Sequence, residues 1–113
     1  MRIIAGIARG VPLKTPPGWD VRPTLDRVRE SLFNILAPRI AGARFLDLCA
    51  GTGANGIEAL SRGAAMATFV DKDARSLSII RDNLLKTKLA ADARCLHLDA
   101  MNELGRLSGP FDI

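Results

Sequence analysis

The sequence predicts an α/β fold in which an incomplete parallel sheet follows an N-terminal β-hairpin and a helix. From residue 44 onward, short apolar segments alternate with segments whose apolar residues recur every three or four positions, as in alternating strands and helices. A glycine-rich turn follows the first of these apolar segments, as is typical of the start of a βαβ unit. The length of 113 residues limits the chain to one domain at most.

The residues before this alternating pattern predict a hairpin and one helix. Residues 2–7 and 11–14 favour two short strands joined by a turn, and a proline-rich break follows at residues 16–18. A helix is then expected to be capped by Thr24 and to end before Pro38. Helical spacing predicts that its buried stripe consists of Leu25, Val28, Leu32, Ile35 and Leu36.

The alternating part predicts a parallel sheet with right-handed crossovers. The segment at residues 111–113 opens a fourth strand, so the sheet is expected to be truncated there. Ligands of such sheets bind at the carboxyl ends of the strands. The expected strands are 44–48, 66–70 and 95–98, and the expected helices are 54–62, 73–89 and 101–107.

Charge is distributed unevenly along the chain. Residues 1–44 carry eight basic and three acidic side chains, a net charge of +5, whereas the rest carries a net charge of −1. A basic N-terminal part suits contact with phosphates, although ordinary solubilising surface charge explains it equally well.

Several classes of protein are disfavoured. No stretch approaches the roughly 18 uninterrupted apolar residues of a membrane span, and no secretory signal is evident, so we expect a cytoplasmic protein without a membrane partner. Cys49 and Cys95 lack the paired spacing of a zinc site or a disulfide scaffold. We therefore expect both to be reduced and buried, and we expect no metal.

The turn after the first strand of the sheet, Gly51-Thr52-Gly53-Ala54-Asn55-Gly56, fits the pattern G-x-G-x-x-G. This pattern permits several nucleotide cofactors. In a dinucleotide site, a carboxylate at Asp47 would add negative charge near the pyrophosphate. S-adenosylmethionine has no phosphate and carries an ammonium and a sulfonium, which a carboxylate attracts. Asp47 therefore favours S-adenosylmethionine over NAD.

Two further carboxylates end the next two strands. Asp71 is placed to accept both ribose hydroxyls of the cofactor. Asp99 can accept from the adenine amino group, with the backbone N–H of Ala100 facing a ring nitrogen, although Asp99 alone is better explained as a helix cap. The predicted cofactor contacts are Asp47, Ala50, Gly51, Thr52, Gly53, Asn55, Asp71, Lys72, Asp99 and Ala100.

Two segments resemble the RsmD family of 16S ribosomal RNA guanine-N2 methyltransferases. They are DLCAGTGANGIEALSRGA at residues 47–64 and RPTLDRVRE at residues 22–30, supported by RIIAG at residues 2–6. The resemblance implies a Rossmann-like class I methyltransferase fold. It also implies S-adenosylmethionine-dependent methylation of the exocyclic N2 amine of a guanine in 16S rRNA, either free or in the small ribosomal subunit. We accordingly divide the chain into a basic extension, 1–22, and a cofactor-binding domain, 23–113.

The resemblance further implies a [DN]-P-P-[YF] catalytic motif at the end of the fourth strand. This sequence does not contain it, and the motif is expected just after Ile113, so we assign no catalytic residue and expect the chain to be inactive. Ile7 and Ala8 also depart from the lysine and aromatic residue usual in the family. The candidates for RNA phosphate contact are Arg9, Arg22, Arg27 and Arg29.

Two other functions stay open at this point. The glycine pattern permits an NAD-dependent oxidoreductase, which Asp47 disfavours. The basic N-terminal part permits a non-enzymatic RNA-binding remnant.

Overall fold

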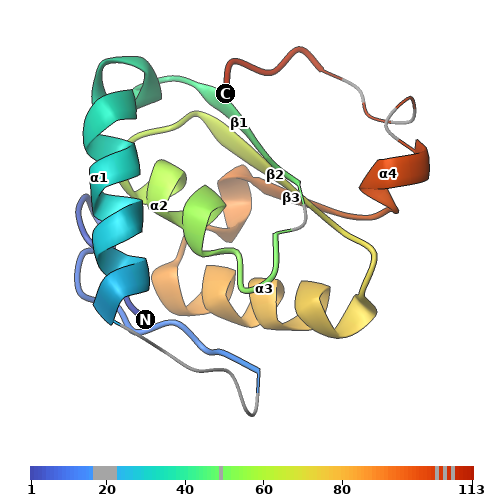
Figure 1. The fold of residues 1–113 in the computed structure, drawn as a ribbon, viewed down its shortest axis with the longest axis horizontal. Helices are drawn as coiled ribbons and strands as arrows, with labels where there is room; N and C mark the ends of the chain where they lie inside the picture. Colours follow the sequence, from blue (N-terminus) through green and yellow to red (C-terminus); the bar gives the residue numbers. More distant parts are fainter. Residues whose placement is uncertain (17–22, 49, 104, 106, 108) are drawn as a thin grey trace.

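A parallel three-stranded sheet forms the centre of the molecule (Figure 1). The computed structural model describes residues 1–16, 23–48, 50–103, 105, 107 and 109–113. The strands lie side by side in chain order and are β1 (Arg44–Leu48), β2 (Met66–Asp71) and β3 (Ala93–His97). The helices are α1 (Pro23–Ile40), α2 (Ala54–Ser61), α3 (Ala74–Thr87), the 3₁₀ turn η1 (Ala90–Asp92) and α4 (Ala100–Glu103). The predicted α/β class with an incomplete parallel sheet is confirmed.

Strand register brings the carboxyl ends of all three strands to one edge of the sheet. Asp47 lies opposite Phe69, and Asp71 lies opposite His97. The loop after β1 and the ends of β2 and β3 therefore share this edge, which is where parallel sheets bind their ligands.

The last residues of the chain pair with the free edge of β1. Leu46 N donates to Ile113 O at 2.8 Å, and Ile113 N donates to Arg44 O at 3.4 Å, which is a parallel pattern. The expected opening of a fourth strand at residues 111–113 thus lies beside β1, on the side away from β2. The direction in which strands are added reverses at β1, so the loop after β1 lies at a topological switch point.

The first sixteen residues do not form the two expected strands. Their antiparallel pairing is limited to the surroundings of one bridge, Arg2 with Pro12. It does not extend further because the backbone donors between the paired parts are bound by side chains of α2. Ile4 N and Ala5 N donate to the Glu58 carboxylate at 2.9 and 3.1 Å, and Ala8 N donates to a serine hydroxyl.

Helix α1 differs from its prediction in both its ends and its buried face. It begins at Pro23, so Thr24 lies inside it, and it continues through Pro38 to Ile40. Proline is tolerated there because it removes a single hydrogen bond in the last turn. The predicted stripe is wrong at Val28, Leu32 and Ile35, which are 61%, 41% and 77% exposed, whereas Leu36 is partly buried against the core and the Leu25 side chain lies outside the described residues. Over residues 26–40, the buried residues of α1 are Arg29, Phe33 and Ile40.

Three interactions explain why α1 turns this other face inward. Phe33 stacks on Phe45 of β1 with ring centroids 6.0 Å apart, and the guanidinium of Arg62 lies 5.2 Å from the centroid of the Phe33 ring. Arg29 forms an ion pair with the buried Glu58.

Among the described residues, no helix is long and apolar enough to cross a membrane.

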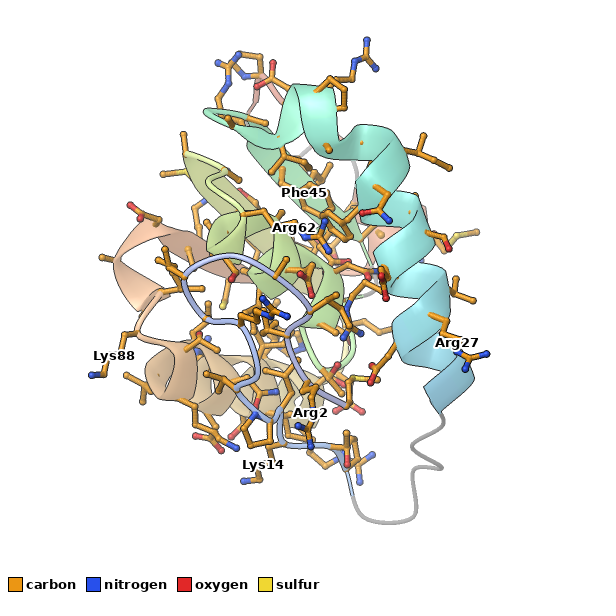
Figure 2. The ribbon with its side chains drawn as sticks, turned by 90° about the vertical axis from the view of Figure 1, so that its left-hand side faces the viewer. Arg2, Lys14, Arg27, Phe45, Arg62 and Lys88 are labelled. Atoms are coloured by element: carbon orange, nitrogen blue, oxygen red, sulfur yellow. The ribbon has the colours of Figure 1, made fainter. Side chains whose placement is uncertain are left out.

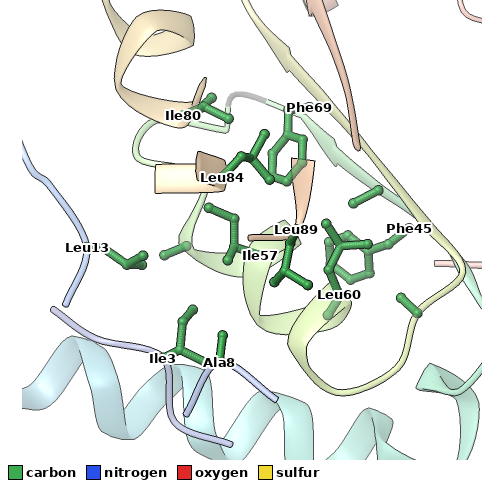
Figure 3. Packing of buried hydrophobic residues seen from close by; sticks show 14 of the residues in the cluster. Ile3, Ala8, Leu13, Phe45, Ile57, Leu60, Phe69, Ile80, Leu84 and Leu89 are labelled. Carbon is green, nitrogen blue, oxygen red and sulfur yellow. The ribbon is translucent and has the colours of Figure 1, made fainter. Parts of the chain in front are cut away.

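The core lies between α2, α3 and β2, and the N-terminal segment closes one side of it (Figure 3). Gly56 of α2 sits directly against Phe69 of β2. A Cβ atom at Gly56 would lie 2.3 Å from the Phe69 ring, so only glycine allows the helix to approach the sheet this closely. The apolar side chains labelled in the figure are Ile3, Ala8, Leu13, Phe45, Ile57, Leu60, Phe69, Ile80, Leu84 and Leu89.

Substitution of Gly56 by alanine is expected to lower the free energy of unfolding by about 1–3 kcal/mol, because the methyl group overpacks the Phe69 contact. Urea denaturation followed by circular dichroism measures this loss. Gly105→Ala is the matched control, since a Cβ there meets nothing within 4 Å. Equal stabilities of the two variants would contradict the packing argument.

Candidate cofactor-binding site

The loop between β1 and α2 is a tight turn built on left-handed glycines. Gly51 and Gly53 have φ values of +61° and +82°, which side chains with a Cβ rarely adopt. Ala50 N donates to Val70 O at 3.0 Å, and Gly53 N donates to Ala50 O at 2.9 Å. These bonds hold the loop over the carboxyl end of β2.

Asp47 is a buried carboxylate at the base of this loop. Its side chain accepts from Gly56 N at 3.1 Å, and the residue is 9% exposed. Burial raises the pKa of Asp47 to about 7, the Gly56 N–H opposes this rise, and the nearby Asp71 charge adds to it. Within the part of the chain that the structure describes, no lysine or arginine forms an ion pair with Asp47. A cationic group of a ligand would supply the missing partner.

Asp71 fastens the loop to the end of β2. Its two carboxylate oxygens accept from Gly51 N at 3.0 Å and from Asp73 N at 2.9 Å. Each carboxylate oxygen has a second lone pair, so Asp71 can still accept from hydroxyl groups of a ligand. The sequence indicated the position of Asp71 but not its bond to the glycine loop.

A cavity of about 120 Å³ lies beside Asp71, between the ends of β2 and β3. Carboxylates and apolar side chains line it, and this combination suits a planar ring with polar edges. Its volume is below the roughly 300–1,000 Å³ of sites that enclose whole drug-sized ligands. The lining residues are Val70, Asp71, Lys72, Leu98, Asp99, Ala100 and Met101.

The structure thus brings four of the predicted contacts into one cavity: Asp71, Lys72, Asp99 and Ala100. Asp99 also accepts from Met101 N at 3.0 Å, so it caps α4 as the alternative interpretation expected. That bond leaves the other lone pairs of the carboxylate to a ligand.

The remaining predicted contacts surround the loop. Asn55 is exposed in the first turn of α2. The Thr52 side chain is buried, and its hydroxyl lies 3.6 Å from the Met1 sulfur, so Thr52 would meet a cofactor through its backbone rather than its hydroxyl.

Two buried polar side chains near the loop were missed from the sequence. Glu58 of α2 and Asn83 of α3 are both 0% exposed and bind backbone groups of the N-terminal segment. Each interrupts the apolar face of its helix, and that interruption was the signal that could have found them.

The predicted RNA contacts fall into three groups. Arg9 and Arg27 are exposed, and Figure 2 shows Arg27 at the start of α1 pointing away from the body. Arg22 lies outside the described residues. Arg29 is a correction: its side chain is 4% exposed and pairs with Glu58 at 3.2 Å and with Asp26 at 3.1 Å. Arg29 therefore neutralises a buried carboxylate, and we withdraw it from the RNA contacts.

Cys95 differs in burial from its prediction. Cys95 is a free thiol and half-buried rather than fully buried; burial raises its pKa, which the Arg81 charge partly offsets. Cys49 lies outside the described residues. Within the described ranges, no group of three or more metal-ligating side chains comes together.

Comparison with known proteins agrees with the resemblance inferred from the sequence. The family described as conserved hypothetical protein 95 matches residues 1–113. The chain belongs to this family. A curated relative of this chain, Ribosomal RNA small subunit methyltransferase D of Escherichia coli K12, is 47% identical over 114 residues, which are 100% of this chain and 57% of that protein. The chain thus spans little more than half the length of this relative.

Solved structures show the same fold. The yhhF protein of Escherichia coli superimposes with a TM-score of 0.82 and 49% identity over 92% of this chain and 56% of its own. A SAM-dependent methyltransferase from Agrobacterium tumefaciens superimposes with a TM-score of 0.64 and 25% identity over 76% of this chain and 28% of its own. The predicted Rossmann-like methyltransferase class is confirmed.

Proposed function

We propose that this chain is the S-adenosylmethionine-binding part of an RNA methyltransferase that modifies the exocyclic N2 amine of a guanine in 16S rRNA. The observation that carries the proposal is Asp47, a buried carboxylate with a raised pKa and no cationic partner among the described residues, directly below the glycine loop. A pyrophosphate would be repelled there, whereas an ammonium would be attracted.

The chain's residues fit the cofactor along one edge of the sheet. Asp47 would hold the ammonium, Asp71 would accept from the ribose hydroxyls, and the cavity with Asp99 and Ala100 would take the adenine. The bound cofactor supplies a methyl group activated by its sulfonium. The described residues bind and orient this donor, and we assign none of them to the transfer step itself.

The acceptor side of the reaction is expected next to the loop. Residues 112–113 pair with β1, so a strand continuing from them would end beside Asp47. The [DN]-P-P-[YF] motif would then lie at the topological switch point, within reach of the donor. In the overall transfer, the N2–carbon bond forms, the sulfur–carbon bond breaks and the amine loses one proton.

The relatives support methyl transfer over the alternative of NAD-dependent oxidation. The Escherichia coli relative is named as a ribosomal RNA methyltransferase, and the Agrobacterium tumefaciens neighbour as SAM-dependent. These names support an RNA substrate and an S-adenosylmethionine cofactor for this chain.

Asp71→Ala is expected to weaken S-adenosylhomocysteine binding by at least about tenfold, because it removes the charged acceptor to which the ribose hydroxyls would donate hydrogen bonds. Calorimetric titration measures this change, with NADH as the competing ligand. Asp92→Ala is the control, since it removes an exposed carboxylate from η1 at the opposite edge of the sheet. Binding of NADH, or undiminished binding of S-adenosylhomocysteine to Asp71→Ala, would reject the proposed cofactor site.

Replacing Arg9 and Arg27 by glutamine is expected to flatten the salt dependence of binding to a 16S rRNA fragment. Each lost phosphate contact reduces the slope of log K against log salt by about 0.7–0.9. Filter binding at several salt concentrations gives the slope. Arg75→Gln, which removes an exposed charge from α3, should leave it unchanged. If the double variant kept the wild-type slope, neither arginine would contact RNA phosphates.

A further inference from the structure

Asn83 uses its whole side-chain amide to join two segments that are distant in the sequence. It lies on α3 and is 0% exposed. Its Oδ1 accepts from Lys14 N at 2.6 Å, while its Nδ2 donates to Lys14 O and to Thr52 O, both at 3.0 Å. Both N–H groups and the carbonyl are therefore satisfied inside the protein.

The two partners of Asn83 are the N-terminal segment and the cofactor loop. With Lys14 the amide pairs as a neighbouring strand would, through one donor and one acceptor, two residues beyond the antiparallel bridge at Pro12. Thr52 lies between the two left-handed glycines of the loop. The hydrogen bond from Asn83 to its carbonyl therefore fixes the middle of the turn.

A second contact joins the same two segments. The Thr52 hydroxyl lies 3.6 Å from the Met1 sulfur, and Met1 O accepts from Leu13 N at 2.8 Å, one residue before Lys14. The remaining loop anchors, at Ala50 and Gly51, come from β2. The loop is thus held from β2 on one side, and from Asn83 and the N-terminal segment on the other.

We propose that Asn83 is a positioning residue that couples the N-terminal segment to the cofactor loop. This inference rests on the proposed function, in which the loop binds S-adenosylmethionine. Asn83 acts through Thr52, whose carbonyl it holds, and needs no contact with the cofactor itself. Because coupling between sites is reciprocal, cofactor binding stabilises the segment around Lys14, and a fixed segment favours cofactor binding. The segment carries Arg9, so cofactor occupancy also affects the part of the chain proposed to meet RNA.

The first test compares Asn83→Ala with Leu84→Ala, a buried neighbour on α3 that packs in the core without a bond to the loop. Calorimetry with S-adenosylhomocysteine is performed on the full chain at a temperature where circular dichroism shows both variants folded. Asn83→Ala should weaken binding roughly five- to thirtyfold, the loss of one or two hydrogen bonds. Leu84→Ala should bind as the wild type does.

Hydrogen exchange supplies a readout that a purely structural role would not change. In the wild type, S-adenosylhomocysteine should slow amide exchange at residues 11–16, and in Asn83→Ala this slowing should disappear. Equal loss of affinity in Asn83→Ala and Leu84→Ala, or ligand-dependent slowing that persists in Asn83→Ala, would overturn the inference.

A second pair of variants tests the coupling from the other end if Asn83→Ala does not fold. Lys14→Pro removes the backbone N–H group that donates to Asn83 Oδ1. Lys14→Ala keeps this N–H group and removes only the exposed ion pair with Asp82. Affinity for S-adenosylhomocysteine should fall in Lys14→Pro and stay unchanged in Lys14→Ala. Equal affinities in this pair would overturn the coupling alone, while absence of binding by the wild type would overturn the proposed function and this inference together.

Discussion

Asp47→Asn is expected to increase the free energy of unfolding at pH 8 while greatly weakening cofactor binding. The pKa of Asp47 is raised from 3.8 to about 7, first by burial. The folded state therefore holds a proton that the unfolded state releases between about pH 4 and 7, and stability falls as the pH rises through this range. Above pH 7 the ionised carboxylate destabilises the fold by up to about 4 kcal/mol, since each unit of pKa shift corresponds to about 1.4 kcal/mol.

Asparagine keeps the shape of the side chain and an acceptor for Gly56 N but cannot ionise. The gain in stability should be about 2–4 kcal/mol at pH 8 and should shrink as the pH falls toward 4. Urea denaturation at pH 8, 6 and 5 measures this dependence. A variant less stable than the wild type at pH 8 would contradict the assigned pKa.

The same substitution removes the counter-charge for the cofactor ammonium. Loss of one partner of a buried ion pair is worth about 3–5 kcal/mol, so affinity for S-adenosylhomocysteine should fall at least about a hundredfold. A rise in stability together with a loss of binding is typical of a residue kept for function rather than for folding. If Asp47→Asn kept its affinity for S-adenosylhomocysteine, the ammonium group would have to bind away from Asp47.

Glu58→Ala is expected to lower the free energy of unfolding by about 3–5 kcal/mol, because it leaves the buried Arg29 guanidinium without its main counter-charge. Glu58 also accepts from Ile4 N and Ala5 N and pairs with Arg62 at 2.9 Å. Its removal should therefore release the N-terminal segment, which limited proteolysis detects alongside urea denaturation.

The control for Glu58→Ala is Asp82→Ala, which breaks the exposed ion pair with Lys14 and should cost less than about 1 kcal/mol. The double variant Glu58→Leu with Arg29→Met should be more stable than Glu58→Ala, because it removes a buried charge on each side of the pair. Comparable losses in Glu58→Ala and Asp82→Ala would mean that the cluster contributes little to folding.

Elements whose neighbours are close in sequence could be predicted. Strands β1 and β2 and helices α2 and α3 follow one another and pack on one another, so hydrophobic period and turn glycines were enough to place them. Residues 111–113 were expected to open a fourth strand, and their backbone does pair with β1, but their place beside this distant strand was not predicted.

The errors arose where distant polar partners decided the structure. Periodicity could not show that Arg29 would turn inward to meet Glu58, so the exposed and buried faces of α1 were misassigned. The same carboxylate binds backbone donors of the N-terminal segment, so the antiparallel pairing there is limited to the surroundings of one bridge. Pairings over 29 and 54 residues leave no local signal in the sequence.

In the candidate site, too, the position of strand ends could be predicted, whereas contacts between distant side chains could not. Asp71, Lys72, Asp99 and Ala100 were expected together, because strand ends share one edge, and they line one cavity. The fixing of Thr52 by Asn83 and of Gly51 by Asp71 could not be predicted, since both depend on side-chain geometry across the fold.

Proton release on binding tests most directly whether the loop takes a cationic cofactor. Calorimetry of S-adenosylmethionine binding at pH 6, in two buffers of different ionisation enthalpy, gives the number of protons released. With a pKa of about 7, Asp47 is mostly protonated at pH 6 and must lose its proton to pair with the ammonium, so close to one proton should be released. Binding without proton release would show that Asp47 does not face the ammonium, and absence of binding would contradict the cofactor site itself.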